Sequence, residues 1–264
     1  MATDESRKFA VITGGSSGIG YEFAKVCAEE KFEVLIVADH GVDEAADRLR
    51  ANGAAVTPVH ADLSTFGGNE GVAATIVQRS QPVDILALNA GKGVAGPFLE
   101  TELERDLAMI SLNIGSVIHL AKRLLPAMVS RGEGRVLITS SIAGTMPGPY
   151  YSTYAASKAY LLSFAEALRH ELNDTGVTVT ALLPGATDTE FFDRAGMQNT
   201  PVNESRKDDP AEVARDAFMA LMAGDDKVVA GSVKNLLQSM AARVTPERFK
   251  AVRHAAQTKP KDLD

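Results

Sequence analysis

Short apolar runs alternate with longer amphipathic stretches along most of this sequence, and this alternation constrains the fold more than any other feature. The runs are apolar on both faces, as are parallel strands covered by helices on both sides of a sheet. Strands are expected at residues 8–14, 32–39, 54–62, 83–91, 134–141, 176–185 and, at an edge, 226–232. Helical patterns fall at residues 18–30, 43–52, 69–80, 101–131, 153–174 and 208–224. This order predicts an α/β fold, a doubly wound and mostly parallel sheet of about seven strands with helices on both faces.

The expected domain organisation is simple. One domain spans residues 1–232 and includes a substrate loop at about 186–209, where no clear period is visible. Residues 233–264 read as a C-terminal helical extension and tail, because an apolar segment is followed by a basic one. The last half-dozen residues are expected to be disordered, as chain ends often are.

Composition narrows the class of protein. The 264 residues carry a net charge of −7, which argues against a nucleic-acid partner because phosphate binding needs a basic surplus. We see no secretory signal and no run long enough to span a bilayer, so no membrane partner is expected. The single cysteine, Cys27, cannot form an internal disulfide, which fits a reducing compartment. A soluble cytoplasmic protein is expected.

A glycine-rich loop, "TGGSSGIG" at residues 13–20, joins the first predicted strand to a helix. Glycines at these positions allow a tight turn, close approach of the backbone to a pyrophosphate and close packing of helix on strand. Free N–H groups and the positive end of the helix then face the phosphates. Strand, loop and helix in this order predict dinucleotide binding. The expected contacts are Gly14, Ser16, Ser17, Gly18, Ile19 and Gly20.

Asp39 ends the second predicted strand, where an acidic side chain can accept hydrogen bonds from the adenosine ribose. The 2′-phosphate of NADP would meet a like charge there, with no arginine or lysine adjacent in the sequence. A protonated His40 would reduce that repulsion. The sequence therefore favours NAD over NADP as the cofactor.

Tyr154 and Lys158 lie four residues apart in a predicted helix and therefore share one face. A free tyrosine has a pKa of about 10, too high for an efficient base near neutral pH. A neighbouring ammonium lowers the pKa of a phenol by roughly one to three. Tyr150, Tyr151 and Tyr160 have no charged residue at this spacing, so we expect them to pack or to line a substrate cleft.

Two serines end the fifth predicted strand, at the edge where open α/β sheets bind ligands. A hydroxyl there can hydrogen-bond a substrate carbonyl oxygen and the alkoxide that develops from it. Ser140 and Ser141 both qualify, and strand alternation sends them to opposite faces.

These segments, in this order and spacing, resemble the short-chain dehydrogenase/reductase family. The resemblance covers about residues 8–231 and rests on TGxxxGxG at 13–20, NAG at 89–91, a serine after the fifth strand, YxxxK at 154–158 and PGATDT at 184–189. It implies a single Rossmann-like domain that transfers a hydride between a nicotinamide cofactor and an alcohol or carbonyl substrate. It also implies a homodimer or homotetramer.

The resemblance further implies a role for individual residues. Ser141 matches the serine that orients the substrate oxygen, Tyr154 the residue that exchanges its proton, and Lys158 the residue that lowers the phenol pKa and binds the nicotinamide ribose. Asn113 matches the asparagine that helps hold a water-linked proton relay. The implied cofactor contacts are Asp62 and Leu63 at the adenine, Asn89, Ala90 and Gly91 on the adenosine side, and Pro184, Gly185, Thr187 and Thr189 along the nicotinamide.

Some signals stay open. Phe191, Phe192 and Met197 are expected to form either an apolar lid over the substrate or a plain buried helix face. The five histidines show no spacing typical of a metal site, so no metal is expected. The chain also continues past the last strand into a further expected helix, unlike many family members. Two alternatives remain, an NADPH-dependent carbonyl reductase and a dinucleotide-binding sensor or scaffold without turnover.

Overall fold

The computed structural model describes residues 7–231 and 247–261, and in these residues seven strands form one parallel sheet. The strand order is β3-β2-β1-β4-β5-β6-β7, so the direction of winding reverses between β1 and β4. This confirms the doubly wound, Rossmann-like α/β fold. The strands are β1 (Phe9–Thr13), β2 (Glu33–Ala38), β3 (Val56–His60), β4 (Ile85–Leu88), β5 (Gly134–Thr139), β6 (Val177–Pro184) and β7 (Lys227–Ala230).

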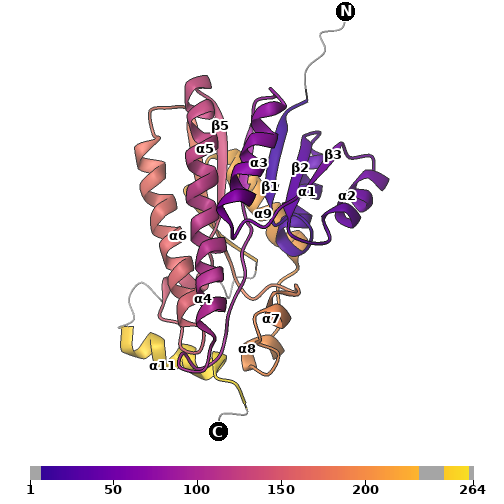
Figure 1. Ribbon diagram of the computed structural model, residues 1–264. Helices are drawn as coiled ribbons and strands as arrows, with labels where there is room; N and C mark the ends of the chain where they lie inside the picture. The colour runs from indigo at the N-terminus through magenta and orange to yellow at the C-terminus, as the bar shows by residue number, and fades with distance from the viewer. Residues whose placement is uncertain (1–6, 232–246, 262–264) are drawn as a thin grey trace, which may run out of the picture.

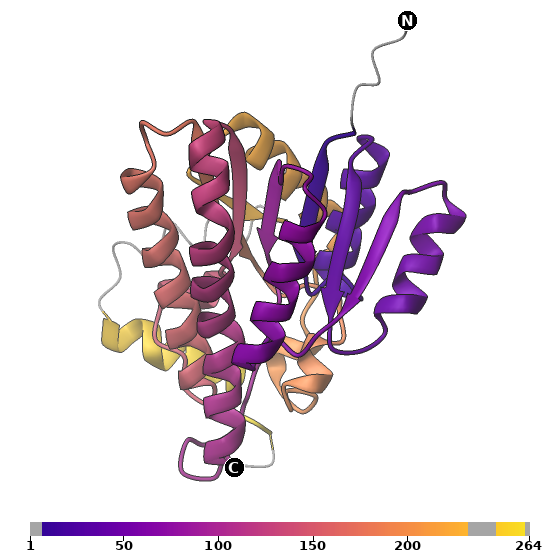
Figure 2. The same ribbon diagram turned by 45° about the horizontal axis from the view of Figure 1, so that its top comes forward.

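Helices cover both faces of the sheet (Figures 1 and 2). Apolar side chains of α3, α5 and α6 pack on one face, and those of α1, α2 and α9 pack on the other. The main helices are α1 (Gly18–Glu29), α2 (Val42–Ala51), α3 (Phe66–Gln78), α4 (Leu103–Ile110), α5 (Ser116–Arg131), α6 (Ser152–Glu171) and α9 (Pro210–Ala223). No helix among the described residues has the length and apolarity needed to cross a membrane.

The central strands explain why this sequence forms buried parallel strands. Val11 and Leu35 contribute to one core cluster, whereas their neighbours Ile12 and Ile36 contribute to the other, and all four are fully buried. Successive side chains of a strand point to opposite faces, so a strand buried on both sides must be apolar throughout. Pro58 lies in the edge strand β3, where a residue without an N–H group is tolerated.

The stretch expected as one helix at 101–131 is interrupted. A π-helical turn at Ser111–Gly115 joins α4 to α5. Such turns are rare and occur often at functional sites. Asn113 lies within this turn and is completely buried.

The region after β6 holds structure that the sequence did not predict. Two short helices, α7 (Phe191–Arg194) and α8 (Pro201–Glu204), occupy the segment without a clear period. Of the C-terminal helical extension expected over 233–264, residues 233–246 lie outside the described residues. Helix α11 (Glu247–Thr258) then packs against α8. The prediction of disorder for the last half-dozen residues is wrong for 259–261, because the Lys261 N–H donates to the Asn199 carbonyl at 3.1 Å.

Candidate active site

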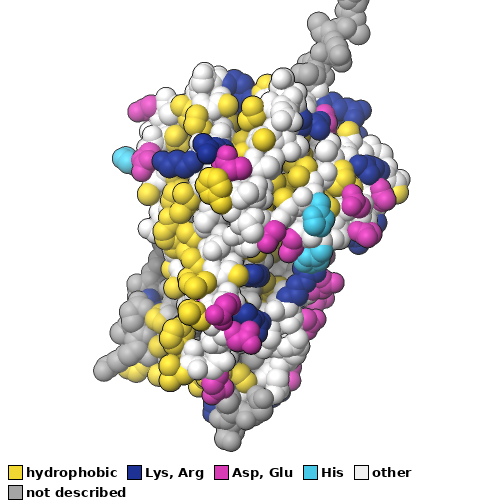
Figure 3. Space-filling model, viewed as in Figure 1, with side chains coloured by type: hydrophobic (Ala, Val, Ile, Leu, Met, Phe, Trp, Pro, Cys, Tyr) yellow, Lys and Arg dark blue, Asp and Glu magenta, His cyan; other side chains and the backbone are white. Residues whose placement is uncertain are grey.

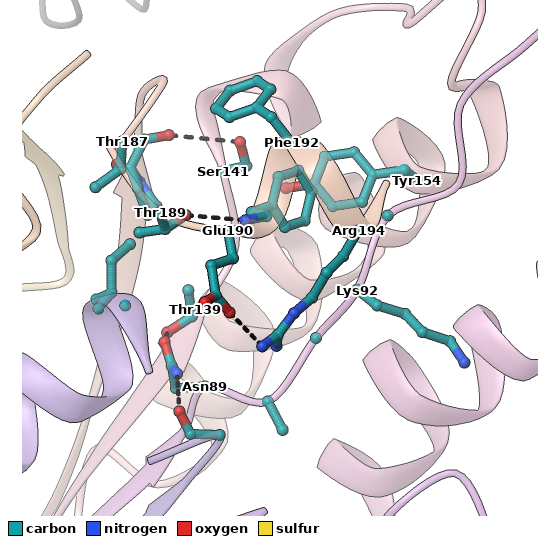
Figure 4. Close-up of a pocket in the computed structure, with 18 of the residues that line it drawn as sticks. Asn89, Lys92, Thr139, Ser141, Tyr154, Thr187, Thr189, Glu190, Phe192 and Arg194 are labelled. Carbon is teal, nitrogen blue, oxygen red and sulfur yellow. Dashed lines mark hydrogen bonds and ion pairs between the residues drawn. The ribbon is translucent and has the colours of Figure 1, made fainter. Parts of the chain in front are cut away.

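The carboxyl ends of the central strands open onto a cavity of about 840 Å³. Open α/β sheets bind their ligands at this edge, beside the point where the winding reverses. All the residues predicted to bind the cofactor line this cavity, together with Ser141, Tyr154 and Lys158. Figure 4 shows several of them converging from different elements. Asn113 is the one predicted site residue that lies behind the cavity wall.

The glycine loop has the geometry that a phosphate site needs. Gly14 and Gly18 have φ angles of +68° and +56°, a region that favours glycine. A Cβ atom on Gly20 would lie 2.1 Å from the Gly14 carbonyl oxygen, so only glycine lets α1 start this close to the loop. The Ser17 side chain makes no capping hydrogen bond to α1. The first N–H groups of α1 are therefore available to an anion at the helix end.

Hydrogen bonds fix the ends of β1, β4 and β5 relative to one another. The Thr13 hydroxyl accepts from the N–H groups of Asn89 and Ala90 at 2.9 and 3.0 Å. Asn89 Nδ2 donates to the Thr13 carbonyl at 3.2 Å, and Asn89 Oδ1 accepts from the Thr139 hydroxyl at 3.1 Å (Figure 4). Because its side chain is engaged at both ends, Asn89 shapes the cavity wall.

Acidic and basic groups meet at the end of the cavity formed by β2. Asp39 and His40 are both exposed, with Oδ1 and Nδ1 2.5 Å apart. Arg48 of α2 donates to the Ser16 carbonyl at 3.3 Å, and its guanidinium lies 4.5 Å from the centroid of the Tyr21 ring. The sequence did not predict a role for Arg48, because no local pattern indicates that α2 places this residue beside the glycine loop.

Tyr154 and Lys158 lie on one face of α6, as their spacing predicts. Lys158 Nζ donates to the Thr139 carbonyl at 2.9 Å and lies 5.8 Å from the centroid of the Tyr154 ring. Burial lowers the pKa of Lys158 to about 8. Burial also raises the pKa of Tyr154 to about 12, a change that a hydrogen bond with Ser141 only partly offsets. The direction for Tyr154 is opposite to the expected one, because burial of the phenol, which the spacing to Lys158 does not reveal, is the largest cause of the shift.

The structure separates the two serines. Ser141 Oγ accepts from the Ala143 N–H at 3.1 Å, donates to the Pro184 carbonyl at 3.4 Å and lies beside Tyr154 (Figure 4). Ser140 Oγ instead donates to the Lys158 carbonyl at 2.7 Å. Ser141 is therefore placed to meet a substrate oxygen, whereas Ser140 fixes α6 to the end of β5.

Asn113 holds the loop that follows β4. Its Oδ1 accepts from the Lys92 N–H at 2.9 Å, and its Nδ2 donates to the Lys92 carbonyl at 3.0 Å and to Ser157 Oγ at 3.1 Å. A Cβ atom on Gly91 would lie 3.2 Å from Asn113 Oδ1 and 3.4 Å from Lys158 Nζ. The π-helical turn thus brings Asn113 close to Lys158.

Aromatic and apolar side chains form the far end of the cavity. The Phe191 ring lies 5.2 Å from that of Tyr154, and Phe192 and Met197 are buried in a small cluster with Ala195. Phe191, Phe192 and Met197 all line the cavity, so they form one of its walls. Tyr151 lines it too, in agreement with the prediction for the neighbouring tyrosines.

His254 also reaches this cavity, where its ring contacts the Tyr151 hydroxyl. Sequence reasoning missed this contact. The two residues are 103 positions apart, and no local pattern connects them.

Comparison with known proteins agrees with this arrangement. A family model described as short chain dehydrogenase matches residues 8–200. The oxidoreductase UcpA of Salmonella typhimurium is 33% identical over 218 residues, which are 81% of this chain and 80% of that protein.

Two solved structures share the fold. A short-chain dehydrogenase from Sphingobium yanoikuyae in complex with NADPH has a TM-score of 0.78 at 30% identity. The match covers 84% of this chain and 87% of that one. A 3-ketoacyl-(acyl-carrier-protein) reductase from Brucella melitensis complexed with NADH has a TM-score of 0.75 at 26% identity. The match covers 84% of this chain and 95% of that one. The chain therefore belongs to the short chain dehydrogenase family.

Proposed function

We propose that this protein interconverts an alcohol and a carbonyl compound in the cavity at the carboxyl ends of the strands. As a member of the short chain dehydrogenase family it is an oxidoreductase. The observation that carries the proposal is that Ser141, Tyr154 and Lys158 meet at one wall of a cavity that also contains the glycine loop. A hydroxyl, a phenol and an ammonium at one point can orient an oxygen and exchange its proton.

The residues of the cavity fit a nicotinamide dinucleotide. The glycine loop leaves room for backbone contact with phosphate, and α1 offers free N–H groups there. When bound, the cofactor accepts or supplies the hydride. The residues proposed to hold it are Gly14, Ser16, Ser17, Gly18, Ile19, Gly20, Asp39, Asp62, Leu63, Asn89, Ala90, Gly91, Tyr154, Lys158, Pro184, Gly185, Thr187 and Thr189.

The proton chemistry is proposed to rest on Tyr154. With its pKa raised to about 12, the phenol is protonated at neutral pH and can donate a proton to the alkoxide that forms during carbonyl reduction. Ser141 would orient the carbonyl oxygen, and Lys158 would supply positive charge beside the phenol. In alcohol oxidation the same phenol would take up the hydroxyl proton, and positive charge beside it, such as the Lys158 ammonium, favours that step. Asn113 would keep the Lys92 loop and Lys158 in place, beside a proton path to solvent.

We propose NAD(H) as the preferred cofactor. The Asp39 carboxylate at the end of β2 suits ribose hydroxyls and repels a 2′-phosphate. Two observations favour the NADPH-dependent alternative, since His40 contacts Asp39 and Arg48 reaches Ser16 of the adjacent glycine loop. The similar solved structures include one complex with NADPH and one with NADH.

Titration with NADH and NADPH at one salt concentration and neutral pH, followed by turnover assays with ketones, tests this proposal. Binding of NADH at least tenfold tighter than NADPH, with reduced cofactor consumed in the presence of ketones, is expected. Tighter binding of NADPH would favour the carbonyl-reductase alternative. Tight cofactor binding without turnover of any alcohol or ketone would favour a sensor or scaffold and would contradict the enzymatic proposal.

A homo-oligomer and a cytoplasmic location complete the proposal. In Figure 3 a band of hydrophobic side chains runs over α5 and α6 toward α4. Leu103, Leu107 and Ile110 follow helical spacing on α4, and their exposed fractions are 64%, 52% and 38%. An exposed apolar helix face of this kind fits a second copy of the chain, and light scattering would test for a dimer or tetramer. Cys27 is a free, buried thiol, as suits a reducing compartment.

A further inference from the structure

Helix α11 brings a histidine into the substrate end of the cavity. His254 is 6% exposed and Tyr151 is 7% exposed, and both line the cavity. Their rings meet edge to face at 5.2 Å, with Tyr151 Oη hydrogen-bonded to His254 Nε2. The general chemistry described above does not use this buried polar pair.

Several hydrogen bonds fix α11 over the loop that leads into α6. The His254 ring is held by the Pro147 carbonyl, which lies 2.8 Å from Nδ1. One turn later, Thr258 Oγ1 donates to the Pro149 carbonyl at 2.8 Å. Beyond the helix, the Lys261 N–H donates to the Asn199 carbonyl. The loop before α6 therefore holds the His254 ring through Pro147, and α11 itself is held by the same loop and, beyond its end, by Asn199.

The partners of His254 determine where the protons lie. A carbonyl oxygen can only accept, so Nδ1 carries the proton that binds Pro147. Burial lowers the pKa of His254, which keeps the ring neutral and leaves Nε2 as an acceptor. Burial also raises the pKa of Tyr151 far above its ordinary value, so the phenol keeps its proton. Tyr151 O–H therefore donates to His254 Nε2.

A tyrosine hydroxyl can donate only one hydrogen bond, and Tyr151 donates it to His254 Nε2, so towards a substrate Tyr151 Oη can only accept. We propose that Tyr151 Oη selects the substrate by accepting a hydrogen bond from a hydroxyl or N–H group on it, with His254 as the positioning residue. This inference rests on the proposed function, because the reacting carbonyl must bind at Tyr154. The rings of Tyr151 and Tyr154 are stacked, with centroids 5.8 Å apart and planes at 27°, and both residues line the cavity, so the two side chains lie next to each other at its wall. The substrate class is a carbonyl compound with a second, donor-bearing polar group, and Phe191 and Met197 line its apolar part.

Binding measurements test this selection independently of turnover. In the Tyr154→Phe background with reduced cofactor bound, the dissociation constants are measured for α-, β- and γ-hydroxy methyl ketones, their methoxy ethers and their deoxy parents. The fluorescence of the bound cofactor reports each binding event. For at least one spacing the hydroxy ketone should bind about tenfold more tightly than its ether, because only the hydroxyl can donate. Adding Tyr151→Phe should reduce this preference to about twofold or less.

Replacing His254 should shift the binding preference the other way, towards the methoxy ether. His254→Phe keeps an aromatic ring but removes the acceptor, so Tyr151 O–H becomes free to donate. The methoxy ether, which can only accept, should then gain relative to the hydroxy ketone. Tyr160→Phe and His170→Asn are matched controls on exposed positions of α6 and should leave every ratio unchanged.

The possible failures are distinguishable. Equal affinity for the three analogues at every spacing would overturn the assignment of Tyr151. A preference that persists in the Tyr151→Phe variant, or one that Tyr160→Phe abolishes, would overturn it as well. Failure of the wild-type protein to consume reduced cofactor with any ketone would instead contradict the proposed function. Thermal unfolding of each variant separates a lost hydrogen bond from a lost fold.

Discussion

Replacing Lys158 by methionine should make the protein more stable while removing activity. The side chain is 4% exposed, and burial lowers its pKa from 10.5 to about 8. Since one pKa unit corresponds to about 1.36 kcal/mol, holding the ammonium in this site costs the folded state about 3 kcal/mol at neutral pH. Methionine has a similar shape and no charge. It loses the hydrogen bond from the charged ammonium to the Thr139 carbonyl, which is worth about 1.5 kcal/mol.

The expected net gain at neutral pH is about 2 kcal/mol in the free energy of unfolding. For a chain of this size that corresponds to a rise of about 4–8 °C in the unfolding midpoint. Urea titration and thermal scans measure both quantities. Lys122→Met is the matched control, because Lys122 is exposed on α5 and its replacement should change stability by less than about 0.5 kcal/mol.

The pH dependence gives the stricter test. The folded pKa of Lys158 lies below the unfolded value, so between pH 8 and 10.5 the unfolded chain holds more protons than the folded one. The stability of the wild type therefore rises with pH in this window relative to the variant, and the advantage of methionine disappears by its upper end. A variant less stable than the wild type at pH 7, or a difference independent of pH, would refute this reasoning.

Three further substitutions follow from the contacts described. Asn113→Leu removes the partner of the Lys92 N–H and carbonyl and should lower the free energy of unfolding by about 2–4 kcal/mol, as urea titration would detect. An unchanged midpoint would contradict the role of Asn113 in holding the loop after β4. Gly20→Ala places a Cβ atom 2.1 Å from the Gly14 carbonyl oxygen and should weaken cofactor binding at least tenfold in fluorescence titrations. Asp39→Ser removes the repulsion of a 2′-phosphate and should tighten NADPH binding about tenfold or more; an unchanged Kd would mean that the carboxylate does not face this group.

The sequence predicted the scaffold and the cofactor end of the cavity because both depend on local patterns. Apolar runs such as residues 32–39 form buried strands, and the glycine spacing at 13–20 dictates a loop that only small residues can form. Strand ends that follow such runs must meet at one edge of a parallel sheet. Tyr154 and Lys158 share a helix face for the same local reason.

The substrate end depends on contacts between residues far apart in the chain and could not be read in this way. His254 reaches Tyr151 only because α11 packs against the loop before α6. Arg48 reaches the glycine loop only because the fold places α2 beside that loop, where Arg48 donates to the Ser16 carbonyl. The pKa of Tyr154 was also not predicted correctly. The spacing to Lys158 indicates a nearby positive charge, but it gives no information on how deeply the phenol is buried, and burial is the largest cause of the raised pKa.

The most direct test of the account is the reaction of the Tyr154→Phe variant. Phenylalanine keeps the ring and its contacts with Phe191 and removes only the proton-bearing oxygen. General acid–base catalysis contributes typically 10²–10⁴-fold, so the rate of ketone reduction should fall by about that factor. The cofactor Kd, measured on the same preparation, should change far less than the rate, because Tyr154 is only one of many residues proposed to hold the cofactor. An unchanged rate would contradict the role of Tyr154, and with it the chemistry proposed for this cavity.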